Sequence, residues 1–328
     1  MIVTRTPFRI TLGGGGTDLP SYYEKYGGFI FSAGLDKYMF VSINRPVIDD
    51  LIRLKYTKIE TVESTNELQH AIARESLRMM GIEKAIEINS IADISAGSGL
   101  GSSSCYAIGL LHGLHTMKRD YVSLAHLAEE DFKLEAQILK RPIGKQDPYL
   151  AAFGGLTVLE IEKNGQVKVR KAAVSEEAAD ELSRNMLVFF TGVTRSADTI
   201  LSEQQSGVRE EKKEVVESMH YIKELGHEIL EAMETSNIDD VGLKFHAHWQ
   251  HKKKISTKMS NPEFDKIYDL AIRNGALGGK ISGAGGGGFF TFYVNKNHAN
   301  FRKVMHSLGL REMRYRFDLE GSKVLVDF

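Results

Sequence analysis

The sequence predicts an α+β protein with two domains. Strand-like and helix-like segments are mixed along the chain without regular alternation, which favours α+β domains over a doubly wound parallel sheet. A chain of 328 residues is long enough for two domains. An acidic and polar stretch at residues 174–185 separates the two halves, so we place the domains at residues 1–180 and 181–328.

The first half contains most of the predicted strands. Phe8, Ile10 and Leu12 alternate with Arg9 and Thr11, which predicts a strand whose polar residues point away from the apolar face. The other elements expected here are a helix at 19–26, strands at 29–43 and 52–62, a helix at 66–80, a strand at 85–91, helices at 105–114 and 124–140, and a hairpin of strands at 156–162 and 167–171.

The second half is predicted to be mainly helical. The expected elements are a strand at 186–190, one or two helices within 197–235, helices at 241–259 and 264–273, a strand at 289–294, a helix at 299–308, and strands at 311–318 and 323–328.

The composition excludes several classes of function. A formal net charge of −1 gives no overall field that would recruit nucleic acid or a membrane surface, so neither partner is expected. No apolar run has the length of a membrane span, and the first residues lack a secretory apolar region. The single cysteine, Cys105, allows no internal disulfide and is interpreted as a packing residue. We therefore expect a cytoplasmic protein, and a homodimer is possible.

The most informative stretch is a glycine- and serine-rich loop between a predicted strand and a predicted helix. Glycine lets a backbone approach an anion closely, and a helix N-terminus offers unpaired N–H groups and the positive end of the helix dipole. The loop is therefore expected to cradle phosphates, although a flexible linker is the simpler alternative for such a composition. Its residues are Gly97, Ser98, Gly99, Leu100, Gly101, Ser102, Ser103 and Ser104.

Three motifs, in order, resemble those of the GHMP kinases. Residues 99–104 look like the phosphate loop of this family, residues 7–18 like its N-terminal motif, and residues 280–288 like its C-terminal glycine motif. The resemblance implies an N-terminal domain like domain 2 of ribosomal protein S5 and a ferredoxin-like C-terminal domain with extra helices. It also implies ATP-dependent phosphoryl transfer to an alcohol, with ATP and Mg²⁺ as cofactors.

Two carboxylates are candidates for roles in this chemistry. Glu135 lies on the inward stripe of the helix at 124–140, where a carboxylate needs a cation or strong hydrogen bonds. A structural ion pair is one explanation, but the resemblance implies that Glu135 and Ser103 hold Mg²⁺, with Ser102 as the alternative hydroxyl. The resemblance also implies that Asp147 orients or deprotonates the acceptor hydroxyl, although Asp147 could simply cap a turn.

The remaining site residues are also carried over from the motifs. Arg9 matches the family's basic residue on the first strand, which would stabilise charge on the transferred phosphoryl group or lower the pKa of the acceptor hydroxyl, although a lone exposed strand arginine is the simpler alternative. Thr17 and Asp18 match the sugar-binding end of the N-terminal motif, although Asp18 could instead cap the helix at 19–26. Gly285 and Gly286 are expected to approach the substrate from the second domain.

Within the family, the first motif most resembles sugar kinases that phosphorylate an anomeric hydroxyl, in particular kinases of heptose 7-phosphate. The expected partner is therefore a small sugar phosphate, destined for a nucleotide-activated heptose and a surface glycan. A second anion site is then needed, and Arg195 is the preferred residue, with Lys145 and Lys37 as the other candidates.

Three alternatives stay open. One is a fucose kinase or another sugar 1-kinase that acts on an unphosphorylated sugar. Another is a silent relative that binds sugar or nucleotide as a regulator, which the presence of both Glu135 and Asp147 disfavours. His246, His248 and His251 could bind a metal, but a polar helix face or the edge of the cleft is the preferred interpretation.

Overall fold

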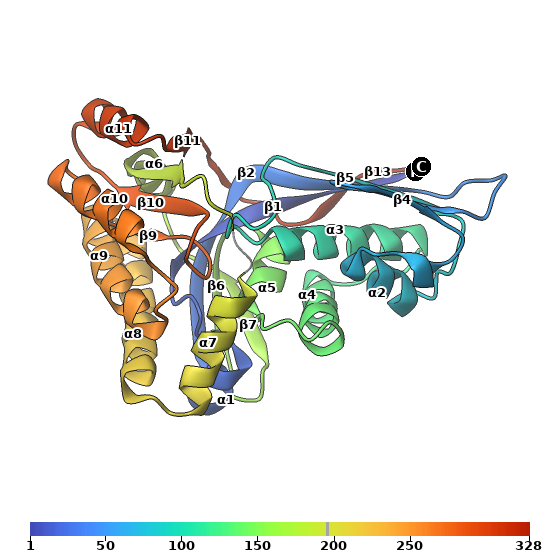
Figure 1. Cartoon of the computed structure of the whole chain (residues 1–328), viewed down its shortest axis with the longest axis horizontal. Helices are drawn as coiled ribbons and strands as arrows, with labels where there is room; N and C mark the ends of the chain where they lie inside the picture. The colour runs from blue at the N-terminus through green and yellow to red at the C-terminus, as the bar shows by residue number, and fades with distance from the viewer. Residues whose placement is uncertain (195–196) are drawn as a thin grey trace.

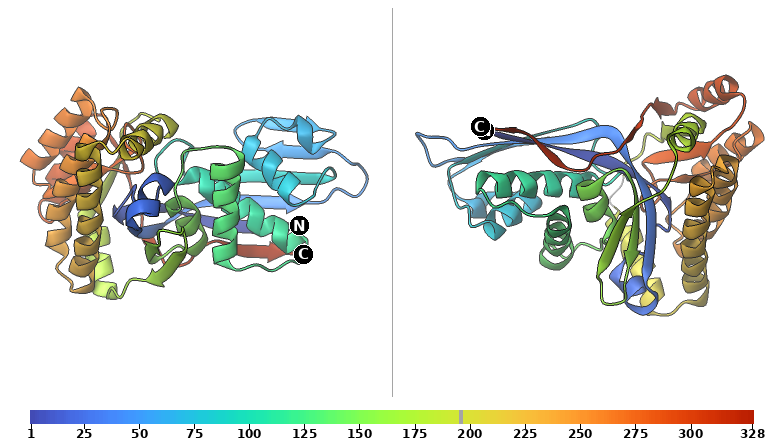
Figure 2. Two further views of the ribbon diagram at one scale, coloured as in Figure 1. Left: turned by 90° about the horizontal axis from the view of Figure 1, so that it is seen from below. Right: turned by 180° about the vertical axis from the view of Figure 1, so that it is seen from behind.

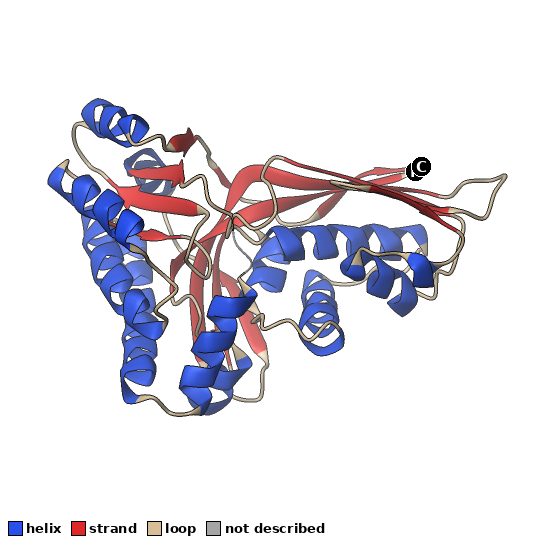
Figure 3. Cartoon of the chain, in the orientation of Figure 1, coloured by secondary structure: helices blue, strands red, loops and turns tan. Residues whose placement is uncertain are grey.

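The structure is a computed structural model that describes residues 1–194 and 197–328. Its described strands form two sheets, one of nine strands and one of four, with helices packed around them (Figures 1 and 3). Figure 1 shows an elongated molecule, with the larger sheet extending to one end and the long helices of the second half gathered at the other. Among the described residues, no helix is both long and apolar enough to span a bilayer.

The larger sheet is built on two long antiparallel strands, β1 (Ile2–Gly13) and β2 (Gly28–Asn44). Its main path runs β13-β1-β2-β5-β3-β4, while β12 and β6 also pair with β2, and β7 pairs with β6. The pairings are antiparallel except between β3 and β5. The other bounds are β3 (Ile52–Lys55), β4 (Ile59–Val62), β5 (Ile86–Ala92), β6 (Leu156–Ile161), β7 (Val167–Lys171), β12 (Phe317–Asp318) and β13 (Lys323–Asp327).

Helices cover one face of this sheet, as Figure 1 shows for α2, α3 and α4. Helix α3 lies close to β1 and β2 because Gly109 and Gly113 have no side chain; a Cβ on Gly113 would lie 2.7 Å from Cδ1 of Ile43. The helical elements of this part are α1 (Pro20–Tyr26), a 3₁₀ turn (Thr65–Glu67), α2 (Ala71–Met79), α3 (Ser102–Met117), α4 (Leu124–Phe132), a π-helical turn (Lys133–Ile138) and α5 (Gln146–Phe153).

The smaller sheet is antiparallel, in the order β11-β8-β10-β9. Its aromatic residues pack with Trp249 and Phe264 into a second core. The strands are β8 (Met186–Phe190), β9 (Gly278–Ile281), β10 (Phe289–Tyr293) and β11 (Arg311–Met313), and the helices are α6 (Glu176–Asn185), α7 (Asp198–Arg209), α8 (Lys213–Glu234), α9 (Ile238–Ile255), α10 (Pro262–Arg273) and α11 (His298–Ser307).

The two ends of the described chain meet at the far end of the larger sheet (Figure 2), where the Met1 amino group donates a hydrogen bond to the Phe328 carbonyl at 3.2 Å. The last strands, β12 and β13, thus return to the first sheet.

The predicted boundary at residue 180 falls inside α6. The division into domains 1–180 and 181–328 stays a prediction.

Several predicted elements differ in detail from the structure. The strand expected at 52–62 is the β3–β4 hairpin, and the helix expected at 66–80 is a 3₁₀ turn followed by α2. The strand at 311–318 is two short strands that join different sheets. Gly278 and Gly279, which lie outside the expected strands, belong to strand β9, where the backbones of Gly242 and His246 come too close for a Cβ on Gly278.

Candidate active site

A cleft of about 870 Å³ is lined by residues from both halves of the chain. The glycine- and serine-rich loop lies on its wall and leads directly into α3, so the predicted order of strand, loop and helix is confirmed. Gly97, Gly99 and Gly101 have φ values between 75° and 84°, which side chains rarely adopt. Gly101 is the residue before the first turn of α3, so the free N–H groups of that turn lie at the cleft.

The loop is held by the C-terminal glycine motif. A Cβ on Gly288 would lie 2.1 Å from the Ser98 carbonyl oxygen, and a Cβ on Gly283 would lie 2.6 Å from that of Gly99. Both glycines have positive φ, so no other residue fits the space or the backbone. The contact explains why two glycine-rich segments far apart in the sequence lie in one site.

Not every residue of the loop faces the cleft. Gly97, Gly99, Gly101 and the three serines line it. Ser98 and Leu100 are fully buried, and the Leu100 carbonyl accepts a hydrogen bond from the Arg9 main-chain N–H at 3.2 Å. The side chains of Ser98 and Leu100 therefore support the loop, which leaves only their main chain for the predicted contact with phosphate.

Arg9 connects the loop to Asp147. Its Nη1 donates to the Gly99 carbonyl at 2.8 Å, while Nε and Nη2 lie 2.8 and 2.6 Å from Oδ1 of Asp147. The guanidinium is almost fully buried, whereas 31% of the Asp147 side chain is exposed toward the cleft. A fixed cation and a carboxylate thus lie together beside the predicted phosphate site.

The structure places Asp147 in the first turn of α5. Pro148 follows in the same turn, where its missing N–H costs no helical hydrogen bond. The Asp147 side chain accepts hydrogen bonds from Arg9 and from Nε2 of Gln146. These partners are side chains, so the alternative of a turn cap is not what the structure shows.

Glu135 lies fully buried in the π-helical turn that follows α4. Such turns shift the side chains that follow out of the regular helical register. Its carboxylate accepts hydrogen bonds from the hydroxyls of Ser103 and Ser104, the latter at 2.9 Å, and from Nη1 of Arg141 at 2.6 Å. The alternative of an ion pair is therefore realised with Arg141, while the pairing of Glu135 with Ser103 agrees with a metal site.

A second carboxylate, Asp131, lies beside Glu135 and was not predicted as a site residue. It is fully buried, and neither of its oxygens has a hydrogen-bond partner among the described residues. Burial, and then the charge of Glu135, raise the pKa of Asp131 well above its usual value. The signal was present in the sequence, since Asp131 lies one turn before Glu135 on the inward stripe.

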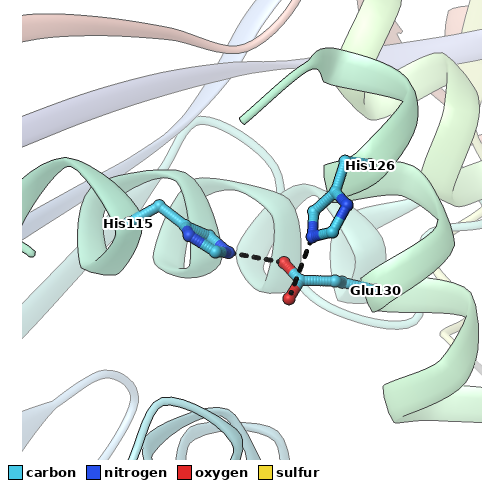
Figure 4. A group of neighbouring side chains, drawn as sticks. All are labelled: His115, His126 and Glu130. Carbon is cyan, nitrogen blue, oxygen red and sulfur yellow. Dashed lines mark hydrogen bonds and ion pairs between the residues drawn. The ribbon is translucent and has the colours of Figure 1, made fainter. Parts of the chain in front are cut away.

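Helices α3 and α4 are joined by a group of side chains that extends from the buried His115 to the exposed His126 (Figure 4). Glu130 lies between two histidines, with Oε2 2.7 Å from Nε2 of His115 and Oε1 3.5 Å from Nε2 of His126. Among the described residues, this is the group whose atoms converge as metal ligands could. His246, His248 and His251 do not converge in this way: His246 bonds to Tyr268, and His251 stacks on Tyr221.

The two residues predicted to bind sugar are placed differently. Asp18 lines the cleft, and its carboxylate accepts hydrogen bonds from the main-chain N–H of Gly16 at 3.2 Å and of Gln146 at 2.9 Å. Asp18 does not cap α1. Burial, followed by the charge of Asp147, raises the pKa of Asp18 to about 6.

Thr17 is fully buried, and its hydroxyl donates to the carbonyls of Gly14 and Phe29, each at 2.8 Å. These bonds do not support a contact between the Thr17 hydroxyl and substrate, which stays a prediction. Gly285 lines the cleft, whereas Gly286 donates its N–H to the Met259 carbonyl at 3.0 Å.

The residues predicted to bind a second phosphate do not face the cleft where the structure describes them. Lys145 is paired with Glu129 at 2.6 Å, and Lys37 with Asp36 at 2.7 Å. Arg195 lies outside the described residues.

The buried Cys105 donates to the Pro7 carbonyl, and burial raises the pKa of its thiol, which agrees with a packing role.

Comparisons with known proteins agree with this geometry. Residues 66–155 match the GHMP kinases N terminal domain, and residues 229–308 match the GHMP kinases C terminal domain. The chain is 30% identical to a D-glycero-alpha-D-manno-heptose 7-phosphate kinase of Campylobacter jejuni, over 98% of each protein. It is 26% identical to an L-fucokinase/L-fucose-1-P guanylyltransferase of Bacteroides fragilis, over 92% of this chain but 35% of that protein.

The solved structure of a D-glycero-D-manno-heptose 1-phosphate kinase from Bacteroides thetaiotaomicron is similar over the whole of both chains, with a TM-score of 0.82 and 23% identity. The predicted fold class is confirmed by this likeness and by the two family matches. The chain belongs to the GHMP kinases, a family of ATP-dependent phosphotransferases that use an alcohol group as acceptor.

Proposed function

We propose that this kinase transfers the terminal phosphoryl group of ATP to the C1 hydroxyl of D-glycero-α-D-manno-heptose 7-phosphate. The product would be the 1,7-bisphosphate, a precursor of nucleotide-activated heptose for a surface glycan. The similarity to the Campylobacter jejuni kinase over 98% of both chains supports the choice of substrate. We infer that the reaction takes place in the cytoplasm, where ATP is supplied.

The observation that carries the proposal is the contact of Arg9 with both Gly99 and Asp147. Phosphoryl transfer depends on positioning and on neutralising charge, because its transition state is loose. Asp147 would accept a hydrogen bond from the sugar hydroxyl and hold it in line with the phosphoryl group. Arg9 would fix Asp147 and stabilise the charge on the phosphoryl oxygens.

We further propose that Ser103 and Glu135 hold Mg²⁺. A hydroxyl and a carboxylate are the hard oxygen ligands that this ion prefers. The buried carboxylate of Asp131, close to Glu135, also favours a cation beside this part of the cleft. When bound, the ion would neutralise phosphate charge. Arg141, which contacts both Ser103 and Glu135, would have to share or leave them.

The test is an ADP-release assay on heptose 7-phosphate, fucose, galactose and mevalonate, with the phosphorylated position assigned by NMR. We expect turnover of heptose 7-phosphate at C1. We also expect Asp147→Asn to lower kcat by roughly 10²–10⁴-fold, while exchange of the exposed Asp269 for Asn leaves kcat unchanged. Turnover of mevalonate alone would refute a sugar kinase.

The similarity to the fucokinase of Bacteroides fragilis favours one second candidate, a kinase of an unphosphorylated sugar. Turnover of fucose but not of heptose 7-phosphate would establish that candidate. Binding of ATP and sugar without any turnover would indicate the regulator instead. A homodimer stays a prediction.

A further inference from the structure

Three basic side chains lie together on the wall that the second half of the chain contributes to the cleft. Lys252 and His248 come from α9, and Lys280 comes from β9. All three line the cleft, yet only 9%, 2% and 3% of Lys252, His248 and Lys280, respectively, are exposed. None of them has a role in the proposed transfer.

No carboxylate forms an ion pair with either lysine among the described residues. Nζ of Lys252 donates to the carbonyls of Ile281, at 3.1 Å, and Gly283. Nζ of Lys280 donates to the Leu12 carbonyl at 2.5 Å. Both ring nitrogens of His248 lack a partner in the part of the chain that the structure describes.

Two other shielded lysines of the chain are paired with acids. Lys145, which is as buried as these two, contacts both carboxylate oxygens of Glu129 at 2.6 and 2.8 Å. Lys244, on the same helix as Lys252, lies 2.5 Å from Glu228 and 3.4 Å from Asp240. Lys252 and Lys280 lack such an acidic partner among the described residues, although both line the cleft.

Burial of an unpaired ammonium group is unfavourable, and it lowers the pKa of Lys252 to about 7, with the charge of Arg9 adding to the effect. Burial also lowers the pKa of Lys280, with the charge of Lys252 contributing. The same causes, with both lysines contributing, lower the pKa of His248 well below its usual value. An anion that enters here would stabilise the protonated forms and recover the cost of burying them.

We propose that Lys252, Lys280 and His248 form a buried phosphate subsite that binds a phosphate group of a substrate in the cleft. The inference rests on the proposed kinase function. Lys252 bonds to Gly283, which packs against Gly99 of the phosphate loop, and Lys280 bonds to Leu12, just before the first glycine run. The subsite therefore lies on a wall of the cleft that contacts both the backbone behind the phosphate loop and the strand that leads into the N-terminal motif.

A phosphate at this position has two potential sources, the 7-phosphate of the acceptor and the phosphoryl group that ATP transfers. We expect the acceptor, because the described lysines predicted for its phosphate, Lys37 and Lys145, are paired with acids outside the cleft. The test must nevertheless follow both substrates.

The test compares Lys252→Met and Lys280→Met with Lys244→Met, a control on α9 that lies outside the cleft. Methionine keeps much of the length and apolar contact of lysine but removes the charge. The measurements are KM for heptose 7-phosphate, KM for ATP, kcat, melting temperature, and the affinity for inorganic phosphate from calorimetry. We expect both cleft variants to weaken phosphate binding and raise KM for the sugar phosphate by roughly tenfold or more, while the control does neither.

The pattern of changes identifies the source of the phosphate. A higher KM for the sugar phosphate with an unchanged KM for ATP supports the subsite and assigns it to the acceptor. A lower kcat or a higher KM for ATP, with weaker binding of inorganic phosphate, supports the subsite and assigns it to the transferred group. Unchanged phosphate affinity and unchanged kinetics in both variants would overturn the proposal.

Melting temperature separates this proposal from a purely structural role. If the lysines serve the subsite, their replacement removes an unpaired buried charge and should leave the melting temperature unchanged or raise it. If the lysines only hold Gly283 and Leu12 in place, their replacement should lower the melting temperature and leave phosphate binding intact. That second result would also overturn the proposal. If the wild-type protein phosphorylates no sugar phosphate while Lys280→Met still weakens binding of inorganic phosphate, the proposed function fails and the subsite stands.

Discussion

Replacement of Asp18 with asparagine should remove a pH-dependent cost of folding. Burial raises the pKa of the Asp18 carboxyl from 3.8 to about 6. Below pH 3.8 the carboxyl is protonated in both the folded and the unfolded chain, so its full stabilising contribution is present. As the pH rises through 6, the folded protein must give up a proton that it holds more tightly than the unfolded chain does, and stability is lost.

The size of the loss follows from the two pKa values. One pKa unit corresponds to about 1.36 kcal/mol, so a rise of about two units removes about 3 kcal/mol between pH 4 and pH 7. Only 6% of Asp18 is exposed, so solvent screens little of this effect. Asparagine has no proton to lose, although it keeps only one oxygen for the N–H groups of Gly16 and Gln146 at every pH.

The assay is urea denaturation of the wild-type protein and Asp18→Asn at several pH values between 4 and 8. We subtract the free energy of unfolding of the wild type from that of the variant. This difference should be larger by about 3 kcal/mol at pH 8 than at pH 4, because only the wild type loses stability as the pH rises. A difference for Asp18→Asn that does not change with pH would refute the reasoning.

Three further predictions concern the loop, the carboxylate cluster and the buried threonine. Gly288→Ala should lower both the melting temperature and the affinity for ATP, because its Cβ would lie 2.1 Å from the Ser98 carbonyl; an unchanged KM for ATP would contradict this. Glu135→Gln should raise the Mg²⁺ concentration for half-maximal activity by roughly tenfold or more, as a Mg²⁺ titration would show. Thr17→Val should cost about 1–3 kcal/mol of stability, because the Thr17 hydroxyl bonds to Gly14 and Phe29. The same variant should leave the KM for the sugar unchanged. A raised KM would support the predicted role of Thr17 in binding.

The sequence was most informative where chemistry depends on neighbouring residues. The loop at 97–104 and its helix could be predicted because glycine spacing and a helix start are local properties. Glu135 was recognised because a carboxylate interrupted an apolar stripe. The turn of π-helix around it could not be foreseen, since a widened turn leaves the same residues in the same order.

The sequence alone could not show which partner a side chain meets across the fold. Lys145 and Lys280 are the same residue type in the sequence, but Lys145 is paired with Glu129, whereas Lys280 contacts a main-chain carbonyl and the ring of Phe245. Thr17 and Asp18 are adjacent, yet one hydroxyl turns into the core and one carboxylate lines the cleft. Such differences are set by tertiary packing, which residue type and spacing do not encode.

The contacts of Gly283 with Gly99 and of Gly288 with Ser98 make the nucleotide loop a shared product of both halves of the chain. A truncated protein that ended before β9 would keep every residue of the loop but lose the backbone against which it rests. In a library of random variants, positions 283 and 288 should therefore be as intolerant of change as residues that touch ATP itself. A separately expressed second half could restore such a fragment only by docking main chain against main chain.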